Sequence, residues 1–184
     1  KNPRIFFANK EIKSPKDMVG MKYRIPNLPI FEKNARAMGA TPVVVAWSEY
    51  PFALMQGVVD GGECSKDSYR SAGLYESAKY VADVDYAYPV EQICFSTQFW
   101  NSLSEEDQKV ISDAAAQVAS HHSERTLDKW EEDKEWLINE GGVTFCDIDR
   151  QAFIDAAEPL GKELQDEGFF TTKDLYDQTR QFNK

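Results

Sequence analysis

Residues 21–62 have the sequence MKYRIPNLPIFEKNARAMGATPVVVAWSEYPFALMQGVVDGG, and this stretch decides the predicted fold. Apolar and polar residues alternate over residues 21–25, which is typical of a half-buried strand. The valine run within residues 41–47 indicates a buried strand. Residues 58–60 predict a third strand, and the two glycines that follow are expected to end it.

Two helices are expected between these strands. The first covers residues 28–38 and ends at Gly39, while Ser48 caps the second, which Gly57 ends. Pro51 is tolerated because it falls in the first turn of the second helix. The resulting β-α-β-α-β order predicts an α/β fold with a parallel sheet and right-handed crossovers.

Three groups of side chains fall where the predicted strands end. Arg24 ends the first strand, Trp47 ends the second, and Glu63-Cys64-Ser65 form a polar turn after the third. Ligands of open α/β sheets bind outside the carboxyl ends of the strands. A cation, an aromatic ring and polar groups at one edge therefore predict a small-molecule binding site.

The remainder of the chain predicts one element of unusual length. Ser104 is expected to cap a helix of ~35 residues that Gly141 and Gly142 end. Such a helix would be ~50 Å long and should span two lobes or kink. The other expected elements are a turn capped by Ser14, strands over residues 79–88, 90–96 and 143–146, a helix capped by Asp149 and running to about residue 167, and a last helix starting at Thr171 or Thr172.

Charge and hydropathy exclude several classes of function. The chain has 184 residues and a formal net charge of −10, without a cluster of Lys and Arg that would bind nucleic acid or an anionic membrane. No apolar run reaches the ~20 residues that span a bilayer. The chain begins with Lys1 rather than Met, so we expect it to be processed or shortened.

Cysteine and histidine provide no metal or catalytic motif. Cys64, Cys94 and Cys146 have no metal-ligand spacing, and their odd number leaves a free thiol or an intermolecular bridge. His121 and His122 are adjacent on the predicted long helix, so their side chains point about 100° apart. We interpret them as solvated, and we predict neither a metal nor a cofactor.

Four segments, in order along the chain, resemble the solute-binding proteins of tripartite ATP-independent periplasmic (TRAP) transporters, the DctP-like family. The match covers nearly the whole chain and corresponds to the C-terminal two-thirds of such a protein. Each motif alone is modest, and their order and spacing make the resemblance specific. The segments are residues 12–27, residues 39–42 with 47–49, residues 53–61, and residues 99–104 with 107–108.

The resemblance implies a periplasmic-binding-protein-like architecture of two α/β lobes joined by a hinge. Residues 1–89 and 130–184 would form the second ligand-binding lobe, and residues 90–129 would cross into the first. The family also has a leading segment that builds most of the first lobe. Since this chain lacks that segment, the resemblance implies a fragment with an incomplete first lobe.

The resemblance also implies roles for two arginines and an aromatic residue. Arg24 would form a salt bridge with the ligand carboxylate, because a planar guanidinium donates two parallel hydrogen bonds. Arg4, twenty positions earlier, would be the second family arginine. Trp47 would pack on the ligand. The alternatives are a surface salt bridge for Arg24, a solvated side chain for Arg4 and a core position for Trp47.

Three further candidates depend on motifs that match less closely. Asn27 would contact the ligand or cap the following helix. Glu63 and Cys64 fall where the family often has Glu-Asn-Pro, whose Asn contacts the ligand. Cys64 is a poor hydrogen-bonding substitute for Asn, and it is either pocket wall or a buried thiol. Glu63 is also expected to order the turn or hold an arginine.

The function implied is binding rather than catalysis. The resemblance implies a periplasmic protein that captures a small organic carboxylate and delivers it to membrane permease subunits. A ligand-sensing module with the same site is one alternative. An enzyme acting on an organic acid is another, for which Cys64 with a histidine is the only nucleophile–base candidate.

Overall fold

One mixed sheet organises the chain in the computed structural model, which describes residues 3–182. Its strands lie in the order β3-β2-β4-β1-β5-β6. The pairs β2–β3, β2–β4 and β5–β6 are parallel, whereas β1 is antiparallel to both β4 and β5. The strands are β1 (Arg4–Ala8), β2 (Lys22–Ile25), β3 (Thr41–Val44), β4 (Gly61–Ser65), β5 (Tyr80–Ala82) and β6 (Thr144–Phe145).

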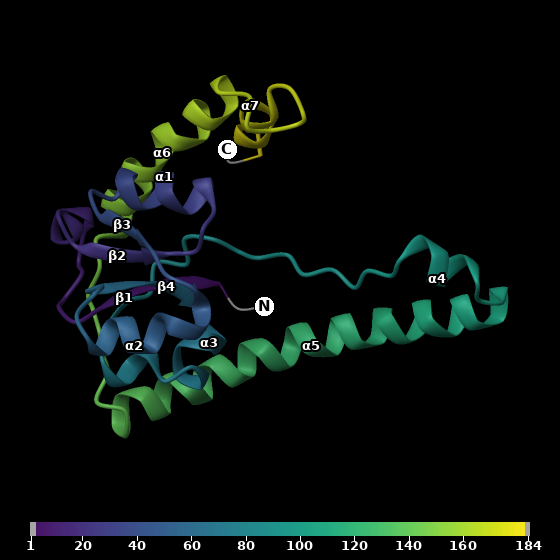
Figure 1. Cartoon of the computed structure of the whole chain (residues 1–184), viewed down its shortest axis with the longest axis horizontal. Coiled ribbons are helices and arrows are strands. Elements are labelled where there is room, and N and C mark those ends of the chain that lie inside the picture. The colour runs from purple at the N-terminus through teal and green to yellow at the C-terminus, as the bar shows by residue number, and fades with distance from the viewer. Residues whose placement is uncertain (1–2, 183–184) are drawn as a thin grey trace.

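Helices cover both faces of this sheet (Figure 1). Helices α1 and α6 pack together on one face, while α2, α3 and the end of α5 lie on the other. The fold is therefore α/β, as predicted. The helices are α1 (Pro29–Ala37), α2 (Tyr50–Met55), α3 (Lys66–Ser71), α4 (Thr97–Asn101), α5 (Glu105–Asn139), α6 (Arg150–Asp166) and α7 (Leu175–Arg180), with short 3-10 turns η1 (Pro15–Met18), η2 (Trp47–Glu49) and η3 (Leu74–Glu76).

Alternation along β1 divides the core into two clusters. Phe6 points into a cluster with Tyr23 and Phe153 beneath α1 and α6. Ile5 and Phe7 point the opposite way, into a cluster that α2, α3 and α5 cover. Successive side chains of a strand face opposite sides, so one strand supplies both cores. Each fully buried large apolar side chain stabilises the fold by about 1.5–3 kcal/mol.

Several local predictions are confirmed. The expected strand and helix at residues 21–25 and 28–38 are β2 and α1. The Ser104 side chain accepts a hydrogen bond from the Asp107 backbone N–H, and the helix it caps runs to Asn139. The Asp149 side chain caps α6 in the same way, through Ala152 N–H. Short-range capping chemistry determines where α5 and α6 begin.

The predicted third strand is misplaced by three residues. Residues 58–60 precede the strand, and Gly61 and Gly62 lie inside β4 instead of ending it. A Cβ on Gly61 would lie 2.2 Å from the Phe7 carbonyl oxygen, and one on Gly62 would lie 2.0 Å from the Tyr50 hydroxyl. The glycines therefore allow β1 and α2 to approach β4 closely. A glycine in a strand can mark such a close approach as well as a break in the strand.

The strand predicted over residues 41–47 is shorter and more exposed than expected. Strand β3 ends at Val44, which is 57% exposed, because β3 is the edge strand next to β2. The chain then enters η2, and Ser48 does not cap a helix. Helix α2 starts at Tyr50 after Glu49, without a side-chain cap.

Predictions for the middle and the end of the chain are partly wrong. Of residues 79–88 only β5 is a strand, and residues 90–96 form none. Val90 and Ile93 are exposed, since no neighbouring strand pairs with this segment. Helix α4 was not predicted, and α7 begins after Asp174 rather than at Thr171 or Thr172.

Residues 90–101 and the first half of α5 form an arm that projects from the sheet (Figure 1). Helix α5 is continuous over 35 residues, and only its C-terminal part is anchored. There, Trp130 and Leu137 are buried, whereas Val110 and Val118 on the arm are 62% and 59% exposed. The division of the chain into lobes at residues 89 and 129 stays a prediction.

Candidate functional site

The two candidate arginines lie at one edge of the sheet. Arg24 lies near the carboxyl end of β2, opposite Gly62 of β4. Arg4 begins β1 and lies opposite Ser65, the last residue of β4. Because β1 runs antiparallel to β4, its amino end meets the carboxyl ends of the parallel strands. This edge is the place where ligands of such sheets bind.

Arg24 is buried without a carboxylate partner. Its side chain is 4% exposed, and its Nε donates a hydrogen bond to the Val45 carbonyl oxygen at 2.9 Å. The guanidinium carbon lies 4.7 Å from the ring centre of Tyr50 and 5.5 Å from that of Trp47. None of the described acidic residues forms an ion pair with it. The alternative of a surface salt bridge therefore does not describe Arg24.

Burial lowers the pKa of the Arg24 guanidinium. An arginine nonetheless keeps its proton in proteins, so the side chain remains a cation. A buried charge without a partner is costly. An anion placed against the Arg24 guanidinium would lower that cost, although Arg24 is not among the residues that line the pocket at this edge.

Arg4 is held by a buried carboxylate. Its Nε donates to Glu63 Oε2, and the Tyr86 hydroxyl donates to the same oxygen at 2.7 Å. Glu63 is 1% exposed. Burial lowers the pKa of Arg4, but the hydrogen bond and charge of Glu63 outweigh it, so this pKa is raised. Glu63 thus holds an arginine, which is one of the roles expected for it.

A pocket of about 260 Å³ opens at this edge. Arg4, Trp47 and Cys64, which the sequence singled out, line it together with Ser65 and Ser68. Trp47 is 45% exposed and packs edge-on against Tyr50, with ring centres 5.9 Å apart, so it forms a wall rather than core. The pocket combines a cation, an aromatic ring and hydroxyl groups.

Three residues near the site were missed by sequence reasoning. Ser68 lies one helical turn after Ser65, and their hydroxyl oxygens are 2.9 Å apart. Tyr50 supports Arg24, and Tyr86 supports Glu63. Only the spacing of the two serines, three apart after a strand, was visible in the sequence. The tyrosines reach the site through long-range packing.

Asn27 is exposed in the loop before α1. The N-cap of α1 is Leu28, and no side-chain hydrogen bond caps this helix. The capping alternative for Asn27 is therefore not what the structure has. Its contact with a ligand stays a prediction.

Cys64 is both pocket wall and buried thiol. It is 1% exposed and belongs to the core cluster that contains Ile5 and Tyr50. Burial raises the pKa of its thiol well above the ordinary value. At neutral pH this cysteine is therefore a neutral, weakly polar group.

Alkylation should distinguish the cysteines. Only a thiolate reacts with iodoacetamide, and burial with a raised pKa removes both access and thiolate. At pH 7.5 we expect Cys94, which is exposed, to react at least about tenfold faster than Cys64. Peptide mass spectrometry over time measures both rates. Equal rates would contradict the buried position of Cys64.

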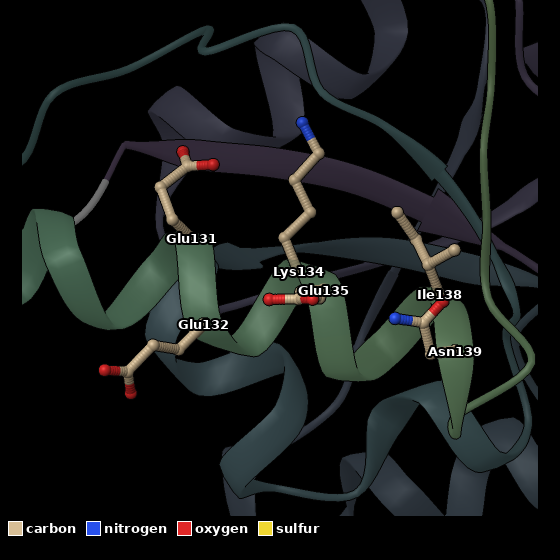
Figure 2. A pocket seen from close by; sticks show the side chains of 6 residues that line it. All are labelled: Glu131, Glu132, Lys134, Glu135, Ile138 and Asn139. Atoms are coloured by element: carbon tan, nitrogen blue, oxygen red, sulfur yellow. The ribbon is translucent and has the colours of Figure 1, made fainter.

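A larger depression, of about 540 Å³, lies along α5 and is a poor candidate for an anion site. Figure 2 shows its side chains leaving this one helix in different directions. Three of them are carboxylates, which repel an anion. The lining residues are Glu131, Glu132, Lys134, Glu135, Ile138 and Asn139.

His121 and His122 are exposed on α5. No hydrogen bond joins Cys64 to either histidine within the described part of the chain. No group of three or more His, Cys, Asp and Glu side chains that could hold a metal ion occurs in residues 3–182 as described. None of the described helices is both long and apolar enough to cross a membrane.

A family model for bacterial extracellular solute-binding protein, family 7 (DctP), matches residues 3–167. The chain belongs to this family. The family resemblance expected from the sequence is thereby confirmed, and with it the α/β periplasmic-binding-protein-like fold class.

Relatives of this family 7 chain include a solute-binding protein of Roseobacter denitrificans, 34% identical over 86% of this chain and 48% of the relative. The structure of a TRAP periplasmic solute binding protein from that organism, with bound L-galactonate, has a TM-score of 0.84 and 29% identity, over 100% of this chain and 59% of that one. A counterpart from Ochrobacterium anthropi, with bound L-fuconate, has a TM-score of 0.83 and 32% identity, over 96% and 57%. The family 7 chain spans about half the length of the curated relatives it matches.

Proposed function

We propose that this chain is part of the extracytoplasmic solute-binding component of a TRAP-type transporter, which captures a small organic carboxylate and delivers it to membrane permease subunits. The observation that carries the proposal is Arg24, a buried cation without an ion-pair partner among the described residues, at the binding edge of the sheet. Membership in solute-binding family 7 supports the transport role.

Each candidate residue has a distinct role in the proposed complex. The ligand carboxylate accepts parallel hydrogen bonds from the outer nitrogens of Arg24, since its Nε already donates to Val45. Arg4, fixed by Glu63, adds positive potential from the wall of the pocket at the same edge of the sheet. Trp47 presents its ring to the carbon skeleton of the ligand.

The ligands of related structures support this class of solute. The Roseobacter and Ochrobacterium proteins hold L-galactonate and L-fuconate, which are both organic acids. A guanidinium that binds the one group these acids share, the carboxylate, explains how one fold can serve several solutes.

The arm supplies a connection to a second lobe in this proposal. Residues 1–89 and 130–184 form the lobe that carries Arg24, and residues 90–129 cross into the other lobe. A ligand bound between the lobes shifts the equilibrium from the open to the closed state. The size of the shift is set by how much more tightly the ligand binds the closed state than the open one. The closed, periplasmic protein would then engage the permease.

We infer binding rather than catalysis for this site. The thiol of Cys64 has a raised pKa and no histidine bonded to it in the described chain, so it lacks the activation that a nucleophile needs. A sensor module that uses the same carboxylate site would bind identically, and a test of permease-dependent uptake separates it from a transport protein.

Fluorescence of Trp47 tests the proposal. Its half-exposed ring lines the pocket, so a bound organic acid should change the emission, whereas the neutral amide of the same acid should not. A Trp47→Phe variant should lose this change, although Trp100, Trp130 and Trp136 remain. A signal that survives intact in Trp47→Phe would place the ligand elsewhere.

A further inference from the structure

We propose that Lys66 is the joint that fixes both connections of the arm to the sheet and couples them to the binding pocket. Residues 83–89 lead from β5 into the arm, and the C-terminal part of α5 leads back from it. Lys66, the first residue of α3, contacts both connections. The attachment of the arm needs no ligand, whereas its coupling to the pocket rests on the proposed function.

Two carboxylates of the outgoing connection hold the Lys66 ammonium. Its Nζ lies 2.8 Å from Asp83 Oδ1 and 2.7 Å from Asp85 Oδ1, and the Lys66 side chain is only 8% exposed. Burial lowers the pKa of Lys66, but the two carboxylates outweigh it, so this pKa is raised and the side chain stays a cation at neutral pH. Since separating buried opposite charges is costly, these ion pairs restrict how residues 83–89 can move.

Asp85 adopts a backbone conformation that its surroundings must hold. Its φ is +50°, in the left-handed region that residues with a side chain rarely occupy. Such a conformation persists where neighbouring contacts impose it. The ion pair with Lys66 and the hydrogen bond from Tyr86 N–H to the Arg4 carbonyl oxygen hold the chain here, just before the arm begins.

The same ammonium lies over the returning connection. Lys66 Nζ is 5.1 Å from the ring centre of Trp130, and this tryptophan on α5 is 4% exposed. An ammonium over the face of an indole ring is attracted by the negative charge of that face. One side chain therefore contacts the segment that enters the arm and the helix that leaves it.

Helix α3 meets the pocket on one side and α5 on the other. Ser65 and Ser68, at its start, line the pocket. Lys66 and Arg70 are four positions apart and so share a different face of the helix, where Arg70 donates to Asp133 of α5 at 2.6 Å. Figure 1 shows α3 beside α5. A ligand that displaces the two serines would therefore also move the two cations that hold the arm.

Distances between spin labels, measured by pulsed electron paramagnetic resonance, test the joint without a ligand. One label is placed at Lys16→Cys, an exposed position of η1. The other is placed on the arm, either on exposed Cys94 or at Val110→Cys, so that both parts of the arm are followed. Cys146→Ser is present throughout, and Cys94→Ser accompanies Val110→Cys, which leaves buried Cys64 as the one unlabelled thiol.

Lys66→Met should broaden both distance distributions at least about twofold, because several positions of the arm then become populated. Lys66→Arg keeps a cation beside both carboxylates and should retain narrow distributions. The matched control is Lys162→Met, which breaks an exposed ion pair with Asp166 on α6 and should change neither distribution. Distributions that are as narrow in Lys66→Met as in the parent protein, or already as broad in the parent, would overturn the inference.

A triple variant separates the joint from the stability of the fold. Lys66→Met alone leaves two largely buried carboxylates without their cation, which is destabilising. Adding Asp83→Asn and Asp85→Asn removes the anions as well, and asparagine tolerates the left-handed backbone at residue 85. The triple variant should unfold at a urea concentration close to that of the parent and still show the broadened distributions. Narrow distributions in the folded triple variant would contradict the joint.

The coupling to the pocket is tested with L-galactonate, L-fuconate and succinate, whose binding the Trp47 fluorescence detects. An acid that binds should shift the mean distance between the labels at Val110→Cys and Lys16→Cys by at least about 2 Å, since packed helices shift by about 1–2 Å at their contacts and the displacement grows along the arm.

The triple variant should bind the same acid within about threefold in Kd and show no such shift, because the substituted residues do not line the pocket. Binding to the parent without a shift of the arm, or an equal shift in the triple variant, would overturn the coupling. Absence of binding by all three acids counts against the proposed function instead, and the ligand-free distributions then decide the joint.

Discussion

Arg24→Ala is expected to abolish measurable binding of the organic acid. Truncating one partner of a buried, hydrogen-bonded charge pair costs about 2–5 kcal/mol, which is at least about 30-fold in Kd. Arg24 is 4% exposed and has no carboxylate of its own among the described residues, so the ligand would be its only ion-pair partner. Calorimetry with a small organic acid that the parent protein binds measures the loss.

Two further variants separate geometry from charge. Arg24→Lys keeps a cation but loses the planar fork, so it should bind more weakly than the parent and more tightly than Arg24→Ala. Arg36→Ala removes an exposed arginine of α1 that pairs with Glu32, and it should leave Kd unchanged. If Arg24→Ala binds like the parent protein while remaining folded, the carboxylate is not held at this edge.

Gly61→Ala is expected to destabilise the fold more than other glycine substitutions. The new Cβ would lie 2.2 Å from the Phe7 carbonyl oxygen and 2.8 Å from Ala8 Cα, and both belong to the backbone of β1. Backbone in the middle of a sheet cannot move aside as a side chain can. Overpacking costs about 1–3 kcal/mol in the free energy of unfolding and occasionally more, and a clash with backbone belongs at the upper end of that range. Urea denaturation measures the loss.

Gly20→Ala is the matched control for backbone strain alone. Gly20 has φ +72° and nothing within 4 Å of an added Cβ, so its cost is the left-handed conformation, about 1–2 kcal/mol. A Gly61→Ala protein as stable as Gly20→Ala would mean that β1 and β4 are not packed as closely as described.

Local chemistry explains which parts of the fold were predictable. Ser104 and Asp149 cap their helices through atoms three residues away, so the sequence contains the whole interaction. Strand β4 was misplaced because Gly61 and Gly62 look like a break until Phe7 and Tyr50 are known to lie against them. Such contacts depend on the tertiary fold and leave no local pattern.

The residues of the candidate site were likewise predictable only where the signal is local in the sequence. Arg4, Trp47 and Cys64 were singled out from strand-end position and family motifs, and the structure brings all three to one pocket. Ser68 and Tyr86 were not, because their roles depend on partners in space. Tyr86 reaches Glu63 across 23 positions of sequence, a contact that no spacing rule predicts.

Helix α5 is anchored at one end only, and this determines how its other end can move. Its C-terminal turns are fixed to α3, where Arg70 donates to buried Asp133 at 2.6 Å and lies over the Trp136 ring at 4.0 Å. Its other end extends away with the arm (Figure 1). The helix can therefore pivot about its contact with α3. Since a helix rises about 1.5 Å per residue, tilting about 30 residues by about 10° would sweep the tip through about 8 Å.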